Sequence, residues 1–432
     1  MEMDIDERKN KLVISFMHSN YLIRSAGTEK FISTYSKIIQ KNGCNHLNFF
    51  SFYSHKSLLG IQIAGVNYND EFIGIIKYCD IEKFIEKIVY EKNMSIEAIH
   101  LQHMQSHSLT ELSKIINRWN APTYVFVHDF FVLCDSPHLV DSQGKYCGAT
   151  IPNENKCKKC SYKGIIHFSK MKAFFSEIEK NLVSVIVPSD FVKNAITECF
   201  PEFSKKVFVR PHLIITGKKN YSEISGKIRI AFAGRQSEEK GFKEWCNLVT
   251  STYPKLKEKY EFYYLGIDSQ KIQGVSNIYV SIAQQGKNAM IDAIKKNDIA
   301  CAFVWPLCAE TYSYVYYELS LAGVFMLSNS ISGNIAVEIE NNENGKVFET
   351  LEECKEWLKD YELVVKTINE YRINGKFRPA NYEENENVQL STCESKLSQK
   401  TVPLGKMPRC KILILETAIY KFRFKNKGLN LN

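Results

Sequence analysis

Short β-rich runs alternate with longer helical patterns along most of this chain, and this alternation constrains the fold more than any other feature. In the first series, strands are predicted at residues 12–16, 46–52, 98–101, 123–127, 184–187 and 206–209, with helices near 28–40, 81–92, 108–118, 168–179 and 190–198. In the second, strands are predicted at 227–232, 260–265, 278–280, 299–304 and 324–327, with helices near 242–251, 287–295 and 314–321. Such alternation is typical of parallel sheets covered on both faces. The sequence therefore predicts an α/β protein with two doubly wound domains.

The 432 residues are enough for two or three domains of roughly 100–200 residues each. We predict a first domain over residues 1–215 and a second over 226–350, joined by the polar stretch 216–226. A helix over 351–380 is predicted to pack back on the first domain, and 381–432 to form a linker and a basic, aromatic tail. Open parallel sheets bind ligands beyond the carboxyl ends of their strands, so two such domains would share a site in the cleft between them.

Composition argues against several classes of protein. Apolar residues make up 44% of the chain and charged residues 24%, which is ordinary for a globular protein and excludes a fibrous or wholly disordered one. The longest apolar runs fall short of the roughly 18 residues that a membrane-spanning helix needs. The first residues are acidic and precede a short apolar run, the reverse of a secretory signal, so we expect a cytoplasmic protein.

The basic excess is concentrated near the end of the chain. There are 56 basic and 48 acidic side chains, a net charge of +8. Residues 406–427 alone contain seven bases and one acid. The body is therefore close to neutral, which argues against a nucleic-acid-binding core with basic residues along a groove.

Two carboxylates, Glu310 and Glu318, are separated by seven residues around the start of a predicted helix. Ser313 is a suitable N-cap and Gly323 a suitable C-cap, which places Glu310 on the strand-to-helix loop and Glu318 in the first two turns. Each carboxylate can accept hydrogen bonds from the vicinal hydroxyls of a ribose or a hexose. Acids are also common at helix starts, so two solvated carboxylates are the alternative interpretation.

A glycine-bounded turn from Gly234 to Gly241 follows the first predicted strand of the second domain and opens its first helix. It carries Arg235 and Lys240, and cations beside the amides of a helix start are suited to a diphosphate. The alternative is a polar turn whose bases point into water.

With three further motifs, these segments resemble the retaining GT-B glycosyltransferases of family four. The five motifs follow the family's order within residues 11–350; they are AGTE at 26–29, VHDFF at 127–131, VPSDFV at 187–192, Arg-x4-Lys within 234–241, and E-x7-E at 310–318. The His-Asp motif followed by Cys134 and Pro137 is most similar to members that build bacterial surface polysaccharides such as O-antigen or capsule. The resemblance implies two Rossmann-like domains that face each other across a cleft.

The resemblance also implies roles for individual residues. Arg235 and Lys240, with Gly234, would bind the donor diphosphate and stabilise the charge that develops as the sugar–phosphate bond breaks. Glu318 would accept hydrogen bonds from the nucleotide ribose and Glu310 from the transferred sugar.

The resemblance implies roles for two residues of the first domain as well. His128 would lie beneath the donor sugar, and Gly27 would let the first loop approach the phosphates closely. A structural histidine at a strand end is the alternative for His128.

The implied reaction retains the anomeric configuration, uses the departing diphosphate as base and requires no metal or other cofactor. Its implied substrates are a nucleotide-sugar donor and a glycan acceptor, expected to be lipid-linked. The alternatives are a non-catalytic subunit that binds nucleotide sugars, and a nucleotide-sugar epimerase of the same fold.

Thirteen cysteines are an odd number and most lie singly in apolar segments, so they are expected to be reduced. Cys134, Cys147, Cys157 and Cys160 form a separate group, because residues 157–160 are a CxxC pair and the other two lie just upstream. Four thiolates can close a tetrahedral structural zinc site. Unpaired thiols, or a redox pair within the CxxC segment, are the alternatives.

The end of the chain has two interpretations as well. Residues 381–400 are polar and predict a linker, whereas 410–427 combine apolar and basic side chains. One interpretation is an anchor that draws the enzyme to the anionic inner face of a membrane, where a lipid-linked acceptor would lie. The other is a strand or helix docked on the body, since residues 421–425 alternate like an edge strand.

Overall fold

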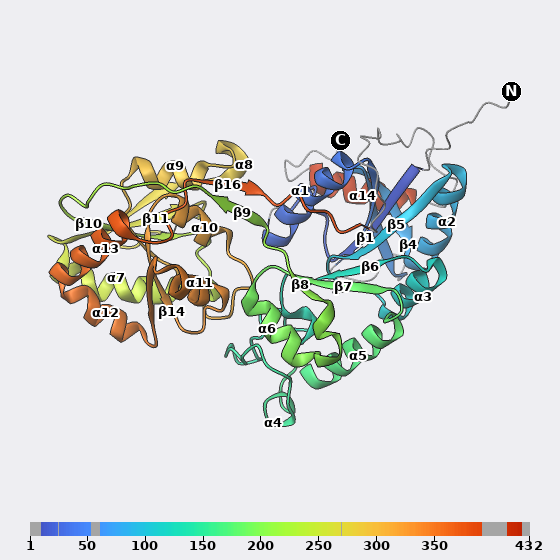
Figure 1. Ribbon diagram of the computed structural model, residues 1–432, viewed down its shortest axis with the longest axis horizontal. Helices are drawn as coiled ribbons and strands as arrows, with labels where there is room; N and C mark the ends of the chain where they lie inside the picture. The colour runs from blue at the N-terminus through green and yellow to red at the C-terminus, as the bar shows by residue number, and fades with distance from the viewer. Residues whose placement is uncertain (1–9, 25, 53–60, 269, 391–412, 426–432) are drawn as a thin grey trace.

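The computed structural model describes residues 10–24, 26–52, 61–268, 270–390 and 413–425, which form two α/β halves (Figure 1). The sheet of the first half contains, in spatial order, β4 (Glu71–Lys77), β3 (Ile63–Tyr68), β2 (Cys44–Ser51), β1 (Asn10–Met17), β5 (Met94–Leu101), β6 (Thr123–Phe126), β7 (Leu182–Val187) and β8 (Val207–Val209). Neighbouring strands are parallel except at β3, which is antiparallel to both β2 and β4.

Helices cover both faces of this sheet. Those on one face are α2 (Ile81–Glu91), α3 (Leu109–Trp119), α5 (Gly164–Glu177) and α6 (Asp190–Cys199), and those on the other are α1 (Gly27–Lys41) and α14 (Ile414–Lys425). Successive residues of a strand point to opposite sides, so Leu12, Ile14 and Phe16 of β1 join the first layer, while Val13 and Met17 join the second. The apolar run of β1, interrupted only at Ser15, reflects this burial on both faces.

The sequence prediction missed the hairpin formed by β3 and β4. Asn69 and Asp70 connect the two strands, and both have positive φ angles, 48° and 65°. A two-residue type I′ turn requires positive φ at both positions, where Asn and Asp are favoured. The Asn-Asp pair between two apolar runs was the sequence signal that could have predicted this hairpin.

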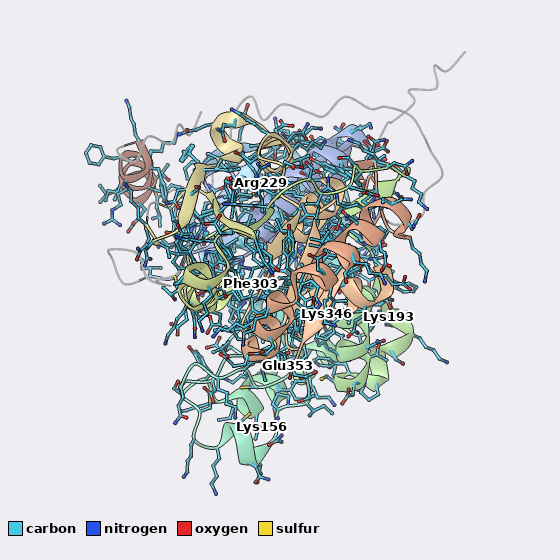
Figure 2. The ribbon with its side chains drawn as sticks, turned by 90° about the vertical axis from the view of Figure 1, so that its left-hand side faces the viewer. Lys156, Lys193, Arg229, Phe303, Lys346 and Glu353 are labelled. Carbon is cyan, nitrogen blue, oxygen red and sulfur yellow. The ribbon has the colours of Figure 1, made fainter. Side chains whose placement is uncertain are left out.

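The sheet of the second half is parallel throughout. Its strands are, in spatial order, β12 (Val275–Tyr279), β11 (Tyr260–Gly266), β10 (Ile228–Ala233), β13 (Cys301–Phe303), β14 (Phe325–Asn329) and β15 (Gly345–Phe348). One face carries α7 (Phe242–Leu256), α12 (Leu351–Lys359) and α13 (Tyr361–Asn374), and the other carries α9 (Ala289–Lys296), α10 (Tyr314–Leu321) and α11 (Asn334–Asn342). Figure 2 looks onto this half, with Phe303 of β13 near its centre. The predicted α/β class with two helix-covered sheets is confirmed, and the domain limits remain predictions.

The prediction that residues 351–380 form a helix packed on the first domain is wrong. The segment forms α12 and α13, which bury Leu358 and Ile368 in the core of the second half, beside α7. Asp360 separates the two helices, and its side chain caps α13 by accepting a hydrogen bond from Leu363 N. The apolar stripes of both helices therefore complete one face of the second sheet.

The chain then returns to the first half. β16 (Asn381–Glu384) pairs with β9 (Leu213–Thr216) in a two-stranded ribbon that lies between the halves (Figure 1). Arg210 donates hydrogen bonds to the carbonyl oxygens of Asn385 and Asn387, at 2.6 and 2.9 Å. Residues 381–390 thus belong to the folded body, which corrects the prediction of a linker that begins at residue 381.

Helix α14 docks on the edge strand β4. Leu413 N donates to Ile75 O at 2.9 Å, and Ile75 N donates to Thr417 Oγ1 at 3.0 Å. Tyr420 is buried among phenylalanine rings of β2 and β4. Of the two interpretations of the tail, the structure shows the docked helix, and residues 421–425 are helical rather than extended. No helix in the described part of the chain combines the length and the hydropathy that crossing a bilayer requires.

Candidate functional site

The two halves meet at the loop that follows β13. Thr311 Oγ1 donates a hydrogen bond to the carbonyl oxygen of His128, and Ser189 Oγ donates one to the carbonyl oxygen of Thr311. His128 and Ser189 belong to two of the five motifs, VHDFF and VPSDFV, in the predicted first domain. The loop that carries Glu310 therefore contacts both of those motifs.

The turn with Arg235 and Lys240 lies at the carboxyl end of β10. Because β10 has β11 on one side and β13 on the other, this turn is at the switch point of the second sheet, where open parallel sheets bind ligands. Gly241 has φ 79°, and a Cβ there would lie 1.9 Å from the carbonyl oxygen of Trp305. Only glycine permits this approach, which holds the turn against the loop after β13.

Lys240 and Glu310 form an ion pair across these two loops. Glu310 is positioned by its backbone, because its N–H donates to Ser332 O at 3.1 Å and its carbonyl oxygen accepts from Asn334 N at 2.9 Å. Burial opposes the charge of Lys240, but the Glu310 carboxylate outweighs burial and holds the pKa of Lys240 above its usual value. The structure thus pairs Lys240, predicted to bind the phosphates, directly with Glu310, predicted to bind the sugar.

Arg235 and the two predicted phosphate-loop glycines are open to solvent. Arg235 is exposed, and the described part of the chain places no carboxylate within ion-pair distance of it. A Cβ on Gly234 or on Gly27 would meet no other atom within 4 Å. Gly234 has φ 113°, which itself favours glycine, whereas nothing in the described residues requires glycine at 27. The space in front of Gly27 is therefore open to a ligand.

Glu318 projects from α10 toward the first half. Ser313 caps this helix by accepting a hydrogen bond from Tyr316 N, and Gly323, with φ 72°, ends it, as the sequence predicts. Glu318 is 7% exposed, and Nζ of Lys30 in α1 lies 3.7 Å from its carboxylate. Burial raises the pKa of Glu318, and Lys30 offsets this only in part. The partner of this carboxylate is a residue that the sequence analysis did not single out.

His128 follows β6 and is held on several sides. Its Nε2–H donates to Gln102 Oε1 at 2.9 Å, and its ring packs against Phe31 and His212. Burial, with the nearby His103, lowers the pKa of His128 to about 3, so the ring is neutral at pH 7. A neutral ring can pack beneath a sugar but does not supply a cation.

A polar cluster at the carboxyl ends of β1, β5 and β6 was not predicted. His103 Nδ1 accepts a hydrogen bond from Gln105 N at 3.1 Å, so its Nε2–H donates to Asp129 Oδ2 at 2.9 Å. The His18 ring packs against the His103 ring at an angle of 52°, with centroids 4.2 Å apart, and His18 Nε2 lies 3.6 Å from Glu29 Oε1. Burial disfavours the Asp129 charge, but His103 outweighs burial, and the pKa of Asp129 is about 2. The sequence contained a signal for this cluster, namely polar residues just after three predicted strands. The carboxyl ends of neighbouring parallel strands lie at the same edge of a sheet, so residues that follow them come together.

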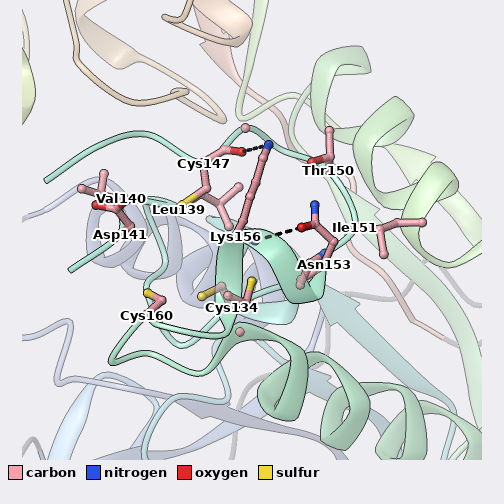
Figure 3. Close-up of a pocket in the computed structure, with 14 residues that line it drawn as sticks. Cys134, Leu139, Val140, Asp141, Cys147, Thr150, Ile151, Asn153, Lys156 and Cys160 are labelled. Carbon is pink, nitrogen blue, oxygen red and sulfur yellow. Dashed lines mark hydrogen bonds between the residues drawn. The ribbon is translucent and has the colours of Figure 1, made fainter. Parts of the chain in front are cut away.

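Cys134, Cys147, Cys157 and Cys160 line one pocket near the short helix α4 (Glu154–Cys157), in a segment that projects from the body (Figures 1 and 3). Among the described residues, however, no three Cys, His, Asp or Glu side chains form a set that could hold a metal ion. Burial raises the pKa of Cys134 and of Cys147, so both are protonated thiols at pH 7. The structure gives the zinc prediction no support and shows four free thiols.

The fold is similar to that of known enzymes, although neither protein-family models nor curated protein sequences match this chain. A glycosyltransferase from Rickettsia africae ESF-5 is 12% identical with a TM-score of 0.51, and the match covers 84% of this chain and 92% of that chain. Sucrose-phosphate synthase from Thermosynechococcus elongatus is 11% identical with a TM-score of 0.50, and covers 84% of this chain and 93% of its own. Both are GT-B proteins, and at this identity the similarity shows the fold alone. The predicted GT-B architecture, with two Rossmann-like halves, is confirmed.

Proposed function

We propose that this protein is a glycosyltransferase that moves a sugar from a nucleotide-sugar donor to a glycan acceptor. The observation that carries the proposal is the Lys240–Glu310 pair at the switch point of the second sheet. The pair joins a cation suited to a diphosphate with a carboxylate suited to sugar hydroxyls, and Arg235 lies exposed on the same turn. The GT-B fold supports the proposal, since the two solved neighbours are named as a glycosyltransferase and a sucrose-phosphate synthase.

In the proposed reaction, Arg235 and Lys240 hold the diphosphate and stabilise the negative charge that grows on it as the bond to the sugar C1 breaks. In this proposal cationic side chains, and no metal ion, neutralise the diphosphate. Glu310 accepts hydrogen bonds from the transferred sugar and Glu318 from the ribose, which positions C1. The acceptor hydroxyl attacks C1 from the face that the diphosphate leaves, and its proton passes to a departing phosphate oxygen. Retention of the anomeric configuration follows from this geometry.

A donor screen followed by a turnover assay tests the proposal. A ligand that binds only the folded state raises the melting temperature, so one series among UDP-, GDP- and dTDP-sugars should raise it, and that donor should be consumed. Binding without turnover on a broad acceptor panel would instead identify a subunit that binds nucleotide sugars. Conversion of the sugar without any acceptor would identify an epimerase. If no nucleotide binds, the proposal is wrong.

We further propose that the acceptor is lipid-linked and that α14 brings the cytoplasmic enzyme to the inner face of the membrane, for synthesis of a surface polysaccharide such as O-antigen or capsule. One face of α14 is buried on β4, whereas Ile414, Leu415 and Phe422 are 82%, 62% and 65% exposed. Lys421 and Lys425 lie exposed on the same helix. An apolar face flanked by cations is suited to the surface of an anionic bilayer.

Vesicle binding tests the membrane proposal without removing the buried face of α14. Leu415→Ser combined with Phe422→Ser should lower binding to vesicles that contain anionic lipid. The matched control is Leu363→Ser with Ile373→Ser, two exposed apolar residues of α13. Equal partitioning of the parent and the α14 variant would contradict the proposal.

A further inference from the structure

Lys30, in α1 of the first half, places its ammonium group beside residues of the second half. Its Nζ is 3.7 Å from Glu318 Oε1 and 4.1 Å from the centroid of the Tyr314 ring. Its side chain is 30% exposed, so a ligand can reach it. The preceding residue of α1, Glu29, points elsewhere and accepts a hydrogen bond from Ser19 within the first half. α1 therefore presents its cation, and not its acid, to the second half.

Glu318 is incompletely neutralised in this arrangement. Its side chain is 9% exposed, and Lys30 is the one cation of the described residues within 4 Å of it. At 3.7 Å the ammonium lies beyond hydrogen-bond distance, so the carboxylate keeps acceptor sites for other donors. Lys30 and Glu318 can therefore each exchange this 3.7 Å contact for a hydrogen bond to a ligand.

The charges of the proposed donor site do not suffice without Lys30. Arg235 and Lys240 are two cations, and Glu310 and Glu318 are two carboxylates, so these four groups carry no net charge. A nucleotide sugar brings a diphosphate with two negative charges. Lys30 adds the missing cation, and the start of α1 adds the partial positive charge of a helix N-terminus.

We propose that Lys30 binds the donor diphosphate, and that Glu318 holds it in place until the donor arrives. The inference rests on the proposed function, in which Glu318 accepts hydrogen bonds from the ribose. When ribose hydroxyls take the Glu318 oxygens, Lys30 is released and turns to the phosphate oxygens. One contact replaces another, so neither Glu318 nor Lys30 is left without a partner in either state.

Titration of Lys30→Met with a nucleoside, its monophosphate and its diphosphate tests the inference. The base is the one found in the donor screen. Affinity for the diphosphate should fall about tenfold or more, and affinity for the nucleoside should not fall, because one charge-assisted contact to phosphate is lost. Lys37→Met, exposed on the same helix, is the matched control and should bind like the parent. An equal loss for nucleoside and diphosphate would show that Lys30 only ties the halves together, and would overturn the inference.

Inorganic pyrophosphate provides a second test, because it has no ribose to displace Lys30 from Glu318. Glu318→Gln frees Lys30 and should bind pyrophosphate more tightly than the parent. Removal of a nearby negative charge would have the same effect, so the double variant with Lys30→Met separates the two causes. The gain should vanish in the double variant, and a gain that persists there would overturn the inference.

The two proposals fail in different ways. A parent protein that binds no nucleotide overturns the proposed function and the role of Lys30 together. A parent that binds the diphosphate no better than Lys30→Met does overturns the role of Lys30 alone.

Discussion

The charged side chains of the candidate site are largely paired before any ligand binds. Lys240 lies against Glu310, and Lys30 lies near Glu318. Removing one member of a buried or half-buried pair leaves the other without compensation, which costs more than the pair itself contributes. Substitutions at single positions should therefore have large effects on donor binding and turnover.

Lys240→Ala should lower kcat/KM by about 10- to 150-fold, because the loss of a charge-assisted hydrogen bond costs about 1.5–3 kcal/mol. The effect falls on the transition state, where charge on the diphosphate is greatest. Lys243→Ala, at an exposed position of the first turn of α7, is the control and should keep the parent's rate. Steady-state kinetics with the donor from the screen measures both. Activity of Lys240→Ala within twofold of the parent would contradict its assignment.

Among the elements, the turn between β10 and α7 depends on one glycine. Gly241→Ala should destabilise the protein more than Gly286→Ala, which is the matched control. Both positions have positive φ, 79° and 90°, at a cost of roughly 1–2 kcal/mol for alanine, but only the Cβ at 241 meets a backbone oxygen. The melting temperature of Gly241→Ala should be lower by at least about 2–4 °C than that of the control. Equal shifts would show that the turn can move away from Trp305.

The docking of α14 depends on its buried face. Tyr420→Ala removes an aromatic ring from a layer of phenylalanines, a loss of about 3–5 kcal/mol for a buried aromatic side chain. We expect fast hydrogen exchange along α14, with the rest of the first half still protected. Phe422→Ala, at an exposed position of the same helix, should leave exchange unchanged. Unchanged protection of α14 in Tyr420→Ala would contradict this packing.

At the scale of the whole molecule, buried neutral histidines link stability to pH. Burial lowers the pKa of His18, His100 and His128 to about 3, and that of His46 to about 4. In the unfolded chain each has a pKa near 6.5, so below that pH the unfolded state binds more protons than the folded state. The stabilisation is complete above pH 6.5 and is lost as the pH falls toward 4 for His46 and toward 3 for the other three.

The free energy of unfolding should therefore fall between pH 7 and pH 5, by up to about 1.4 kcal/mol per pH unit for each such histidine. Denaturant unfolding at the two pH values measures it. His128→Gln should show a weaker pH dependence than the parent, and His138→Gln, at an exposed position, should match the parent. Identical slopes for parent and His128→Gln would indicate that His128 takes up a proton in the folded state.

The sequence alone predicted those features that depend on residues close together in the chain. Helix α10 begins and ends where its cap Ser313 and its terminator Gly323 predict, and the spacing places Glu310 before the helix and Glu318 within it. The central strands β1 and β10 were predicted because strands buried on both faces appear as largely apolar runs, interrupted here only at Ser15 and Arg229.

Other features were decided only by tertiary packing. The amphipathic patterns of α12, α13 and α14 indicate that one face is buried, but not which sheet covers it, and the structure places α12 and α13 on the second sheet and α14 on the first. The contacts of Lys30 with Glu318 and of His103 with Asp129 join residues far apart in the chain. A cap or a turn depends on hydrogen bonds between near neighbours, so the sequence determines it. An ion pair or a docked helix depends on which surfaces meet in space, and only the complete packing of both halves decides that.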